Sequence, residues 1–383
     1  MGAHSALRDL LEPIYQDRPD LKNKLRAAQA QLYRMRTAAW QQFPVLIRPT
    51  PQHIYLALTA NCNLRCKGCR YGREFMSGAQ LPLDVAKQVL DDARALDFEL
   101  VRLYGGEPLL HKNIVEIVEH CTALKLRTYL TTNGMLLRKK FDDLYAAGLR
   151  RLSIGMYGLG ASYDEYVQRP NRFAKLEENL AYVRDRYGDR VHIGLNWLLM
   201  RPTCSVEAVR EMWEFAARYR MPISVNLIQY SLPYFSEGED RELQFSEADR
   251  PAIEAVVVEL MRLQRAQPEL LRMPLTVLRS IPDWLIRRAQ MRVPCDRHRL
   301  IWVGADGTVQ MCYVTFKLGN VHERRLKDML FTPEHLAAAR NGFQLNCPNC
   351  HCGYGVRTLA HGPTRQKYAV AQSFEGACGR VDV

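Results

Sequence analysis

Residues 53–69, HIYLALTANCNLRCKGC, join a short strand-like segment to a loop that carries three cysteines. The apolar and aromatic run His53–Thr59 predicts a buried β-strand. The loop that follows contains Cys62, Cys66 and Cys69 within eight residues, in the spacing C-x3-C-x2-C. A buried strand that ends in a group of thiols is typical of a functional loop on an α/β scaffold.

Strand-like runs and amphipathic helices alternate from about residue 50 to 230. Six βα units with right-handed crossovers predict an α/β fold, a partial (β/α)6 TIM-like barrel, and a doubly wound open sheet is the alternative. Apolar side chains recur at helical spacing at Ile114, Ile117, Val118 and Cys121, so we expect Cys121 in the core. The further strand candidates are Phe98–Tyr104, Leu126–Thr131, Arg151–Met156, His192–Met200 and Ile223–Gln229.

Two more motifs follow predicted strands. Gly105-Gly106-Glu107-Pro108 comes after the second strand, and Thr132-Asn133-Gly134 after the third. The glycines allow the backbone to approach a ligand closely, and Glu107 offers an acceptor. Each motif is also compatible with ordinary turn chemistry. Because the carboxyl ends of parallel strands meet at one end of a barrel, we expect both motifs beside the cysteine loop.

Three thiolates within eight residues can surround one side of a cubane cluster and leave one iron without a protein ligand. Zinc more often uses four ligands, or paired C-x2-C and histidine spacings. The spacing therefore favours an iron–sulfur cluster over zinc or buried thiols.

The cysteine loop, followed in order by Gly105-Gly106-Glu107-Pro108, strongly resembles the radical S-adenosylmethionine (SAM) superfamily over about residues 53–230. The resemblance implies a [4Fe-4S] cluster on Cys62, Cys66 and Cys69, with SAM on its open iron. It also implies that one electron cleaves SAM to methionine and a 5′-deoxyadenosyl radical, which abstracts a hydrogen from the substrate.

The same resemblance suggests the contacts to SAM. Glu107 would lie near the methionine ammonium and Arg169 near the carboxylate. The chain departs from the family at Gly68, where an aromatic residue is common, and at Gly155-Met156-Tyr157-Gly158, where many relatives carry Ser-x-Asp-Gly. In the family that aromatic residue helps to hold adenine, so the resemblance implies either that Tyr71 takes its place or that adenine rests on other groups. The expected SAM-binding residues are Gly105, Gly106, Glu107, Thr132, Asn133, Ser153, Arg169 and Asn196; for Arg169 and Asn196, ordinary surface or strand roles remain open.

A second group of cysteines lies near the C-terminus. Cys295 and Cys312 flank a predicted hairpin that turns at Asp306-Gly307, and a helix predicted at Thr332–Asn341 precedes Cys347 and Cys350. Taken alone, four such thiolates favour zinc. In context they resemble a SPASM domain in its shortened twitch form, which implies one auxiliary [4Fe-4S] cluster on these four cysteines. Cys352 is an alternative ligand, and Cys378 and Cys204 are unassigned.

The composition is that of a globular protein. Of 383 residues, 47% are hydrophobic and 25% charged, and the formal net charge is +12. The basic residues are scattered, so specific nucleic-acid binding is not expected. No run is long enough to span a membrane, and the first residues lack a signal core, so we expect a cytoplasmic protein. We expect a helical cap (1–50), a core barrel (51–235), a helical bridge (236–292) and an auxiliary cluster domain (293–383).

The sequence therefore predicts a radical SAM enzyme, an oxidoreductase or natural-product maturase that acts on a small molecule or a peptide. Oxidation, epimerisation and cross-linking are the candidate outcomes. A flavodoxin- or ferredoxin-type protein would supply the electron. The alternative is a zinc-stabilised nucleic-acid-binding or scaffold protein that uses its cysteines structurally.

Overall fold

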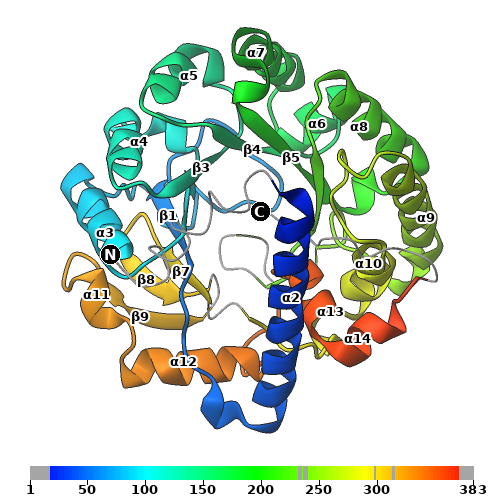
Figure 1. The fold of residues 1–383 in the computed structure, drawn as a ribbon. Coiled ribbons are helices and arrows are strands. Elements are labelled where there is room, and N and C mark those ends of the chain that lie inside the picture. The colour runs from blue at the N-terminus through cyan, green and yellow to red at the C-terminus, as the bar shows by residue number, and fades with distance from the viewer. Residues whose placement is uncertain (1–17, 232–234, 236–239, 297–298, 313–314, 371–383) are drawn as a thin grey trace.

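The computed structural model describes residues 18–231, 235, 240–296, 299–312 and 315–370. A nine-stranded sheet lies at the centre of the protein, with the strand order β6-β5-β4-β3-β2-β1-β7-β8-β9. Strands β1 to β6 are parallel and curve inside a ring of helices, so the predicted partial (β/α)6 barrel is confirmed (Figure 1). Their bounds are β1 His53–Thr59, β2 Leu100–Gly105, β3 Arg127–Thr132, β4 Arg151–Met156, β5 His192–Leu199 and β6 Ile223–Leu227.

The helices between these strands bury one apolar face each against the outside of the sheet. In α4, the predicted residues Ile114, Ile117, Val118 and Cys121 are all fully buried, so the placement of Cys121 in the core is confirmed. The helices are α3 Leu83–Ala95, α4 Ile114–Ala123, α5 Leu137–Ala146, α6 Gly160–Val167, α7 Arg172–Tyr187 and α8 Val206–Arg218.

The predicted strand ends differ from the structure by at most two residues. Strand β2 begins at Leu100 rather than at Phe98, because the preceding turn belongs to the end of α3. Asp97 there has a φ of 65°, and the Phe98 N–H donates to the Ala93 carbonyl at 2.9 Å. A left-handed residue closed by such a bond is a common helix stop, which delays the strand.

The C-terminal strands extend the barrel sheet. The hairpin around Asp306-Gly307 is present as β7 Leu300–Val303 and β8 Thr308–Met311, followed by β9 Phe316–Asn320. Strand β7 pairs in parallel with β1, and Tyr55 is opposite Trp302. The sequence pattern did not predict that the hairpin joins the barrel in this way. The predicted helix is α12 Pro333–Phe343, capped by the Thr332 side chain, which accepts from the His335 N–H.

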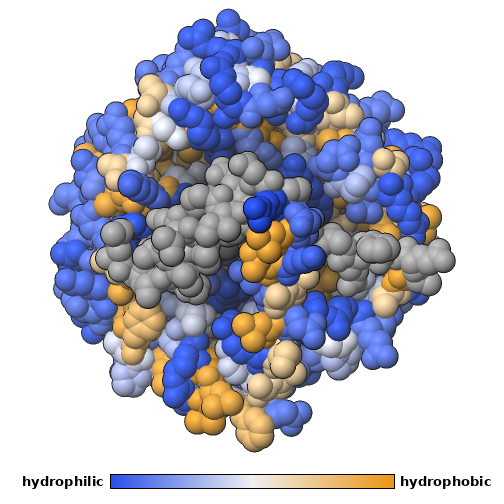
Figure 2. All heavy atoms as spheres, viewed as in Figure 1, coloured by the Kyte–Doolittle hydropathy of each residue, from blue (hydrophilic) through white to orange (hydrophobic). Residues whose placement is uncertain are grey.

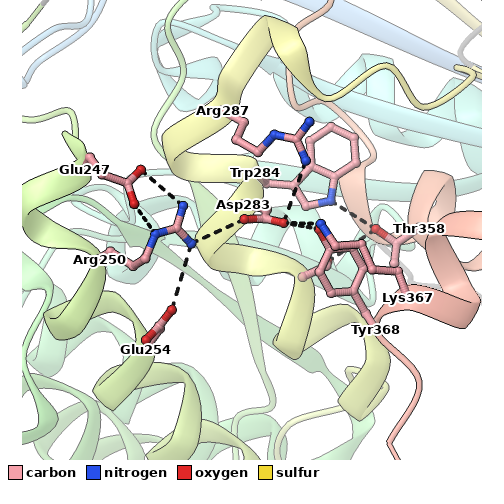
Figure 3. A network of polar contacts seen from close by, with 10 residues as sticks. Glu247, Arg250, Glu254, Asp283, Trp284, Arg287, Thr358, Lys367 and Tyr368 are labelled. Carbon is pink, nitrogen blue, oxygen red and sulfur yellow. Dashed lines mark hydrogen bonds and ion pairs between the residues drawn. The ribbon is translucent and has the colours of Figure 1, made fainter.

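The remaining helices lie before β1 or after β6 in the chain. They are α2 Pro19–Gln42, α9 Arg250–Ala266, α10 Leu275–Arg287, α11 Leu326–Met329, α13 Tyr354–Ala360 and α14 Gly362–Lys367. Asp283 on α10 accepts from Lys367 at 2.7 Å and from Arg250 at 3.3 Å (Figure 3). Trp284 donates to Thr358 at 3.0 Å. These contacts fix α13 and α14 to α10. Of the sequence predictions, Cys378 and the first 17 residues of the cap lie outside the described residues.

One face of the molecule is largely hydrophilic, with apolar side chains gathered along α2 and the turn after it (Figure 2). The exposed apolar residues there include Leu32, Met35 and Phe43. No helix among the described residues is both long and apolar enough to cross a membrane.

Candidate active site: the cysteine loop and its supports

The loops after β1 and β2 are joined by backbone hydrogen bonds. The Gly106 N–H donates to the Thr59 carbonyl and the Glu107 N–H to the Asn61 carbonyl, both at 2.8 Å. A Cβ at Gly106 would overlap the carbonyl oxygens of Ala60 and Asn61, and Gly105 has a φ of +140°. The two glycines thus permit a close approach to the backbone before Cys62, in addition to any approach to a ligand that the sequence suggested.

Glu107 connects the second loop to the third. It is fully buried, and its carboxylate accepts from the Leu109 N–H at 3.0 Å, the Thr132 hydroxyl at 2.7 Å and the Asn133 N–H at 2.8 Å. Burial raises the pKa of Glu107 to about 7, against the lowering effect of these donors. The carboxylate therefore orders the Thr132–Asn133 turn, whatever further partner it has.

The third loop returns to the cysteines. The Asn133 side-chain amide donates to the Asn63 side chain at 2.7 Å and lies 3.9 Å from the Cys62 sulfur. Cys62, Glu107, Thr132 and Asn133 therefore form one connected group at the carboxyl end of the barrel, as the motif order predicts.

The three thiols are close enough to influence one another. Burial raises the pKa of Cys62 to about 11 and raises the pKa values of Cys66 and Cys69, and a thiolate at Cys69 raises those of the other two. Backbone N–H groups of Leu64 and Tyr71 counteract this by donating to the sulfurs of Cys62 and Cys69. Such donors stabilise ligating thiolates, so the donor set suits a metal cluster.

Arg73 holds the turn between the second and third cysteines. Its guanidinium donates to the backbone carbonyls of Cys66, at 2.7 Å, and Cys69. Among the described residues, no three His, Cys, Asp or Glu side chains are gathered as a site for one metal ion. The thiolates of a cubane cluster bind different irons, so such a cluster does not require its ligands to meet at one point.

Helix α6 supports the loop from the other side. Lys67 donates its N–H to the Tyr166 carbonyl at 2.8 Å and Arg65 donates to the Val167 carbonyl at 3.2 Å, so these bonds flank Cys66. One turn earlier in α6, Tyr163 is fully buried and its hydroxyl has no partner in the described structure. The charges of Cys66 and Glu107 raise its pKa further after burial. An unpartnered phenol beside the thiols can donate a hydrogen bond to an anionic cluster or to the ligand of that cluster.

The predicted SAM contacts on β4 and β5 meet each other. Asn196 donates its side-chain amide to the Ser153 hydroxyl, and both side chains lie on the inner face of the barrel. Arg169 follows α6 and is exposed, with its N–H bonded to the Asp164 carbonyl at 3.2 Å. Ser153 and Asn196 thus share one site, while Arg169 lies at the protein surface near the end of α6.

In the C-terminal region, a buried arginine links two cysteine-bearing segments. Arg357 is 1% exposed and donates to the Val293 carbonyl at 3.1 Å and the Cys350 carbonyl at 2.6 Å. It also donates to the Asn349 side chain at 2.7 Å. Burial raises the pKa of Cys347, whereas the Arg357 charge opposes that rise. Arg357 therefore joins the chain just before Cys295 to the Cys347–Cys350 loop.

The same loop is fixed to the barrel. His351 is buried between the carbonyls of Ile228, at 2.8 Å, and Trp284, at 3.1 Å, and burial lowers its pKa to about 3. Cys350 and Cys352 both pack against the inner cluster that includes Tyr55, Tyr104 and Trp302. This position does not distinguish Cys350 from Cys352 as the ligand. Cys312 is placed by its N–H, which donates to the Leu300 carbonyl at 3.2 Å.

Sequence reasoning did not identify Arg73, Asn349 and Arg357. It included Tyr163 only in the stretch Tyr163-Asp164-Glu165-Tyr166, which resembles a His-Asp motif of the family. Asn349 had a signal, because it stands inside the C-x2-C run between Cys347 and Cys350. The roles of Arg73 and Arg357 become visible only when distant segments are placed together. Cys204 is half-buried after β5, and burial raises its pKa to about 12, which keeps the thiol protonated.

Two family models match the chain. The model described as the radical SAM superfamily covers residues 56–227, and the one described as an iron–sulfur cluster-binding domain, SPASM, covers residues 295–352. The first implies SAM and a [4Fe-4S] cluster as cofactors, and the second implies auxiliary iron–sulfur binding.

Curated relatives match parts of the chain. An AdoMet-dependent heme synthase of Methanosarcina barkeri is 34% identical over 137 residues, which is 35% of this chain and 39% of the relative. A GTP 3′,8-cyclase of Marinobacter nauticus is 32% identical over 178 residues, 46% of this chain and 53% of the relative. The chain thus spans about half of the length of these relatives, or less.

Solved structures share the fold at low identity. SuiB of Streptococcus suis bound to S-adenosylmethionine is 17% identical with a TM-score of 0.57, over 81% of this chain and 71% of SuiB. The peptide-bound anSMEcpe with AdoMet is 16% identical with a TM-score of 0.58, over 76% of this chain and 83% of that chain.

Proposed function

We propose that this chain, which belongs to the radical SAM superfamily, cleaves SAM reductively and uses the resulting radical to abstract a hydrogen from a small-molecule or peptide substrate. The proposal extends to natural-product or cofactor biosynthesis, with oxidation, epimerisation or cross-linking as the outcome. The observation that carries it is the position of Cys62, Cys66 and Cys69 in one half-buried loop, connected by hydrogen bonds to the Gly105–Glu107 and Thr132–Asn133 turns.

Cys62, Cys66 and Cys69 would hold a [4Fe-4S] cluster, which when bound would supply the one-electron reduction that cleaves SAM to methionine and a 5′-deoxyadenosyl radical. The protein's part is to hold the reacting groups and exclude water. Arg73 and α6 order the cysteine loop, and Asn133 donates toward the Cys62 sulfur. Glu107 offers a buried carboxylate to an ammonium group, and such a cation would favour its ionised form against the effect of burial.

We assign the SAM sugar to the Ser153–Asn196 pair and the SAM carboxylate to Arg169. The first assignment is supported by the shared position of Ser153 and Asn196 inside the barrel. The second is supported by the location of Arg169 directly after the helix that binds the cysteine loop. A flavodoxin- or ferredoxin-type partner is proposed as the electron donor.

We further propose one auxiliary [4Fe-4S] cluster on Cys295, Cys312, Cys347 and Cys350. Arg357 supports this assignment because it bonds to the segments on both sides. Cys352 packs beside Cys350 and is the alternative fourth ligand.

Anaerobic reconstitution tests the function. The expected result is about eight irons and eight sulfides per chain, with 5′-deoxyadenosine formed from SAM under dithionite. Stoichiometric zinc without iron–sulfur absorbance and without SAM cleavage would overturn the proposal and favour a structural role for the cysteines.

Cysteine variants test the ligand assignment. Replacing Cys62, Cys66 and Cys69 together with alanine is expected to leave about four irons, all auxiliary, and to abolish SAM cleavage. Cys121→Ala is the matched control, because that thiol lies in the α4 core and its removal is expected to leave the iron content unchanged. Retention of about eight irons in the triple variant would refute a single auxiliary cluster.

A further inference from the structure

Helix α2 packs on the protein through one face and presents a second, apolar face to solvent. On the packed face, Thr37 and Trp40 are buried, and the Trp40 ring lies 5.7 Å from the Phe343 ring of α12, measured between centroids. The residues of the outer face are spaced by three and four positions, which places them on one side of the helix. They are Leu25, Ala28, Leu32, Met35 and Ala39, and all five are exposed.

The turn after α2 continues this outer surface. Phe43, Val45 and Leu46 are exposed. The Val45 carbonyl accepts from the Arg48 guanidinium at 2.8 Å and from Arg340 of α12 at 2.9 Å, so the turn is ordered although its apolar side chains face solvent. The apolar ridge, as we call the whole surface, consists of Leu25, Ala28, Leu32, Met35, Ala39, Phe43, Val45 and Leu46.

The apolar ridge concentrates the exposed apolar side chains of the described structure. Of the nine large apolar side chains that are exposed among the described residues, six lie between Leu25 and Leu46. Figure 2 shows them gathered along α2 and the turn on an otherwise largely hydrophilic face. A single exposed apolar residue is ordinary, whereas a gathered set marks a surface on which another molecule or a membrane docks.

The chain around the apolar ridge is basic. No Asp or Glu occurs between Asp20 and Glu74, whereas Lys or Arg occupies six positions from residue 22 to residue 48. Lys24 and Arg48 are exposed, and neither forms an ion pair with another described residue. Lys24 directly precedes the first ridge residue and Arg48 follows the last by two positions. The partner that fits this surface is therefore apolar and carries negative charge.

An anionic lipid surface meets both requirements. Its acyl chains match the apolar ridge, and its phosphate groups match the cations at the two ends. A helix that lies in the plane of a membrane, with apolar side chains on one face and Lys or Arg beside them, is a common form of peripheral membrane contact. A second copy of this chain fits less well, because facing ridges would bring the same cations together.

We propose that the apolar ridge docks on a membrane surface that contains anionic phospholipid, with Lys24 and Arg48 contacting the phosphate groups. The helix would lie parallel to the membrane, because the ridge runs along α2 and into the turn after it (Figure 2). This inference goes beyond the proposed function and does not depend on the iron–sulfur clusters or on SAM.

Vesicle co-sedimentation of the reconstituted full chain tests the inference. The vesicles contain phosphatidylcholine alone or equal parts of phosphatidylcholine and phosphatidylglycerol, and the lipid concentration is varied to obtain a Kd. We expect the wild type to bind the mixed vesicles and not those of phosphatidylcholine alone. On the mixed vesicles, Leu32→Ser should raise the Kd at least about tenfold. Lys24→Gln combined with Arg48→Gln should raise it about thirtyfold.

Each variant has a matched control. Val258 lies on α9 and is 67% exposed, against 65% for Leu32, so Val258→Ser removes an aliphatic side chain of similar exposure. Arg265→Gln combined with Arg272→Gln removes two charges from exposed positions outside the ridge. Both controls are expected to keep the Kd of the wild type.

Several outcomes would overturn the inference. The wild type would fail to bind the mixed vesicles or would bind both kinds equally, or a ridge variant and its control would weaken binding to the same extent. Light scattering without lipid examines a different occupant, because a dimer that Leu32→Ser dissociates would assign the ridge to a second copy. Vesicle binding that appears only after removal of residues 1–17 would assign it to that segment. SAM cleavage enters none of these measurements, so they leave the proposed function untouched.

Discussion

Gly106→Ala is the most direct perturbation of the contact between the first two loops. Gly106 donates its N–H to the Thr59 carbonyl at 2.8 Å, and the next residue donates to Asn61 at the same distance. The added methyl group would overlap the carbonyl oxygens of Ala60 and Asn61, which are backbone atoms and cannot rotate away. The loop that carries Cys62 must therefore move away from β2.

The size of the effect follows from what that movement breaks. Two backbone hydrogen bonds contribute about 1 kcal/mol each, and overpacking at a tight site costs about 1–3 kcal/mol. The expected loss is therefore about 3–5 kcal/mol of unfolding free energy. For a chain of 383 residues this corresponds to a decrease in Tm of about 4–6 °C.

Thermal unfolding followed by circular dichroism measures the decrease, and iron analysis after reconstitution reports on the loop. We expect Gly106→Ala to lose iron at the Cys62 loop and to retain the auxiliary iron. Gly362→Ala is the control, because a Cβ there would have no neighbour within 4 Å. If Gly106→Ala keeps the wild-type Tm and iron content, the glycine is not required for the loop contact and the reasoning is wrong.

Three further predictions concern other parts of the chain. Arg357→Lys keeps the charge but loses the planar fork, so we expect loss of about four irons of the auxiliary site, whereas Arg265→Lys on the exposed face of α9 should lose none. Asp283→Asn weakens the contacts to Lys367 and Arg250 and should lower the free energy of unfolding by about 2 kcal/mol, measured by thermal unfolding. An unchanged Tm would contradict a stabilising role for the Asp283 contacts drawn in Figure 3. The pKa of Glu259 is lowered from 4.5 to about 2 by hydrogen bonds from Arg262 and Arg210. The contribution of the Glu259 carboxylate to the free energy of unfolding is therefore complete above about pH 4.5 and is lost as the pH falls toward 2. In acid unfolding, Glu259→Gln should lose less stability than the wild type over that pH range.

The fold was predictable where its signals are local. Strand β4 was predicted to the residue, and α4 from the spacing of Ile114, Ile117, Val118 and Cys121, because burial of one face imposes a period on the sequence. The pairing of β7 with β1 joins residues 247 positions apart in the chain, with Trp302 opposite Tyr55. No periodic pattern records which edge of a sheet a distant hairpin will extend, so this contact required the structure.

The candidate site likewise contains residues that the sequence predicts and residues that only the structure reveals. The cysteines and the Gly105–Glu107 motif carry a chemical signature in their spacing. Arg357 carries none, because its role comes from burial and from partners far away in the chain. The buried Tyr163 hydroxyl, which has no hydrogen-bond partner among the described residues, is likewise visible only in the structure. The structural role of the two glycines was not predictable either, because only the structure shows that the backbone of Ala60 and Asn61 lies against Gly106.

The shared sheet has a consequence for how the two cysteine regions depend on each other. Tyr71, from the cysteine loop, packs with Ala305 of the hairpin, and the Phe75 ring lies 6.4 Å from Trp302. Strand β7 itself pairs with β1, the strand that leads into Cys62. Separation of the hairpin from the barrel would thus expose an edge of β1 and remove one wall of the cysteine loop. Because metal binding at either region contributes folding free energy, the common sheet makes each region support the order of the other.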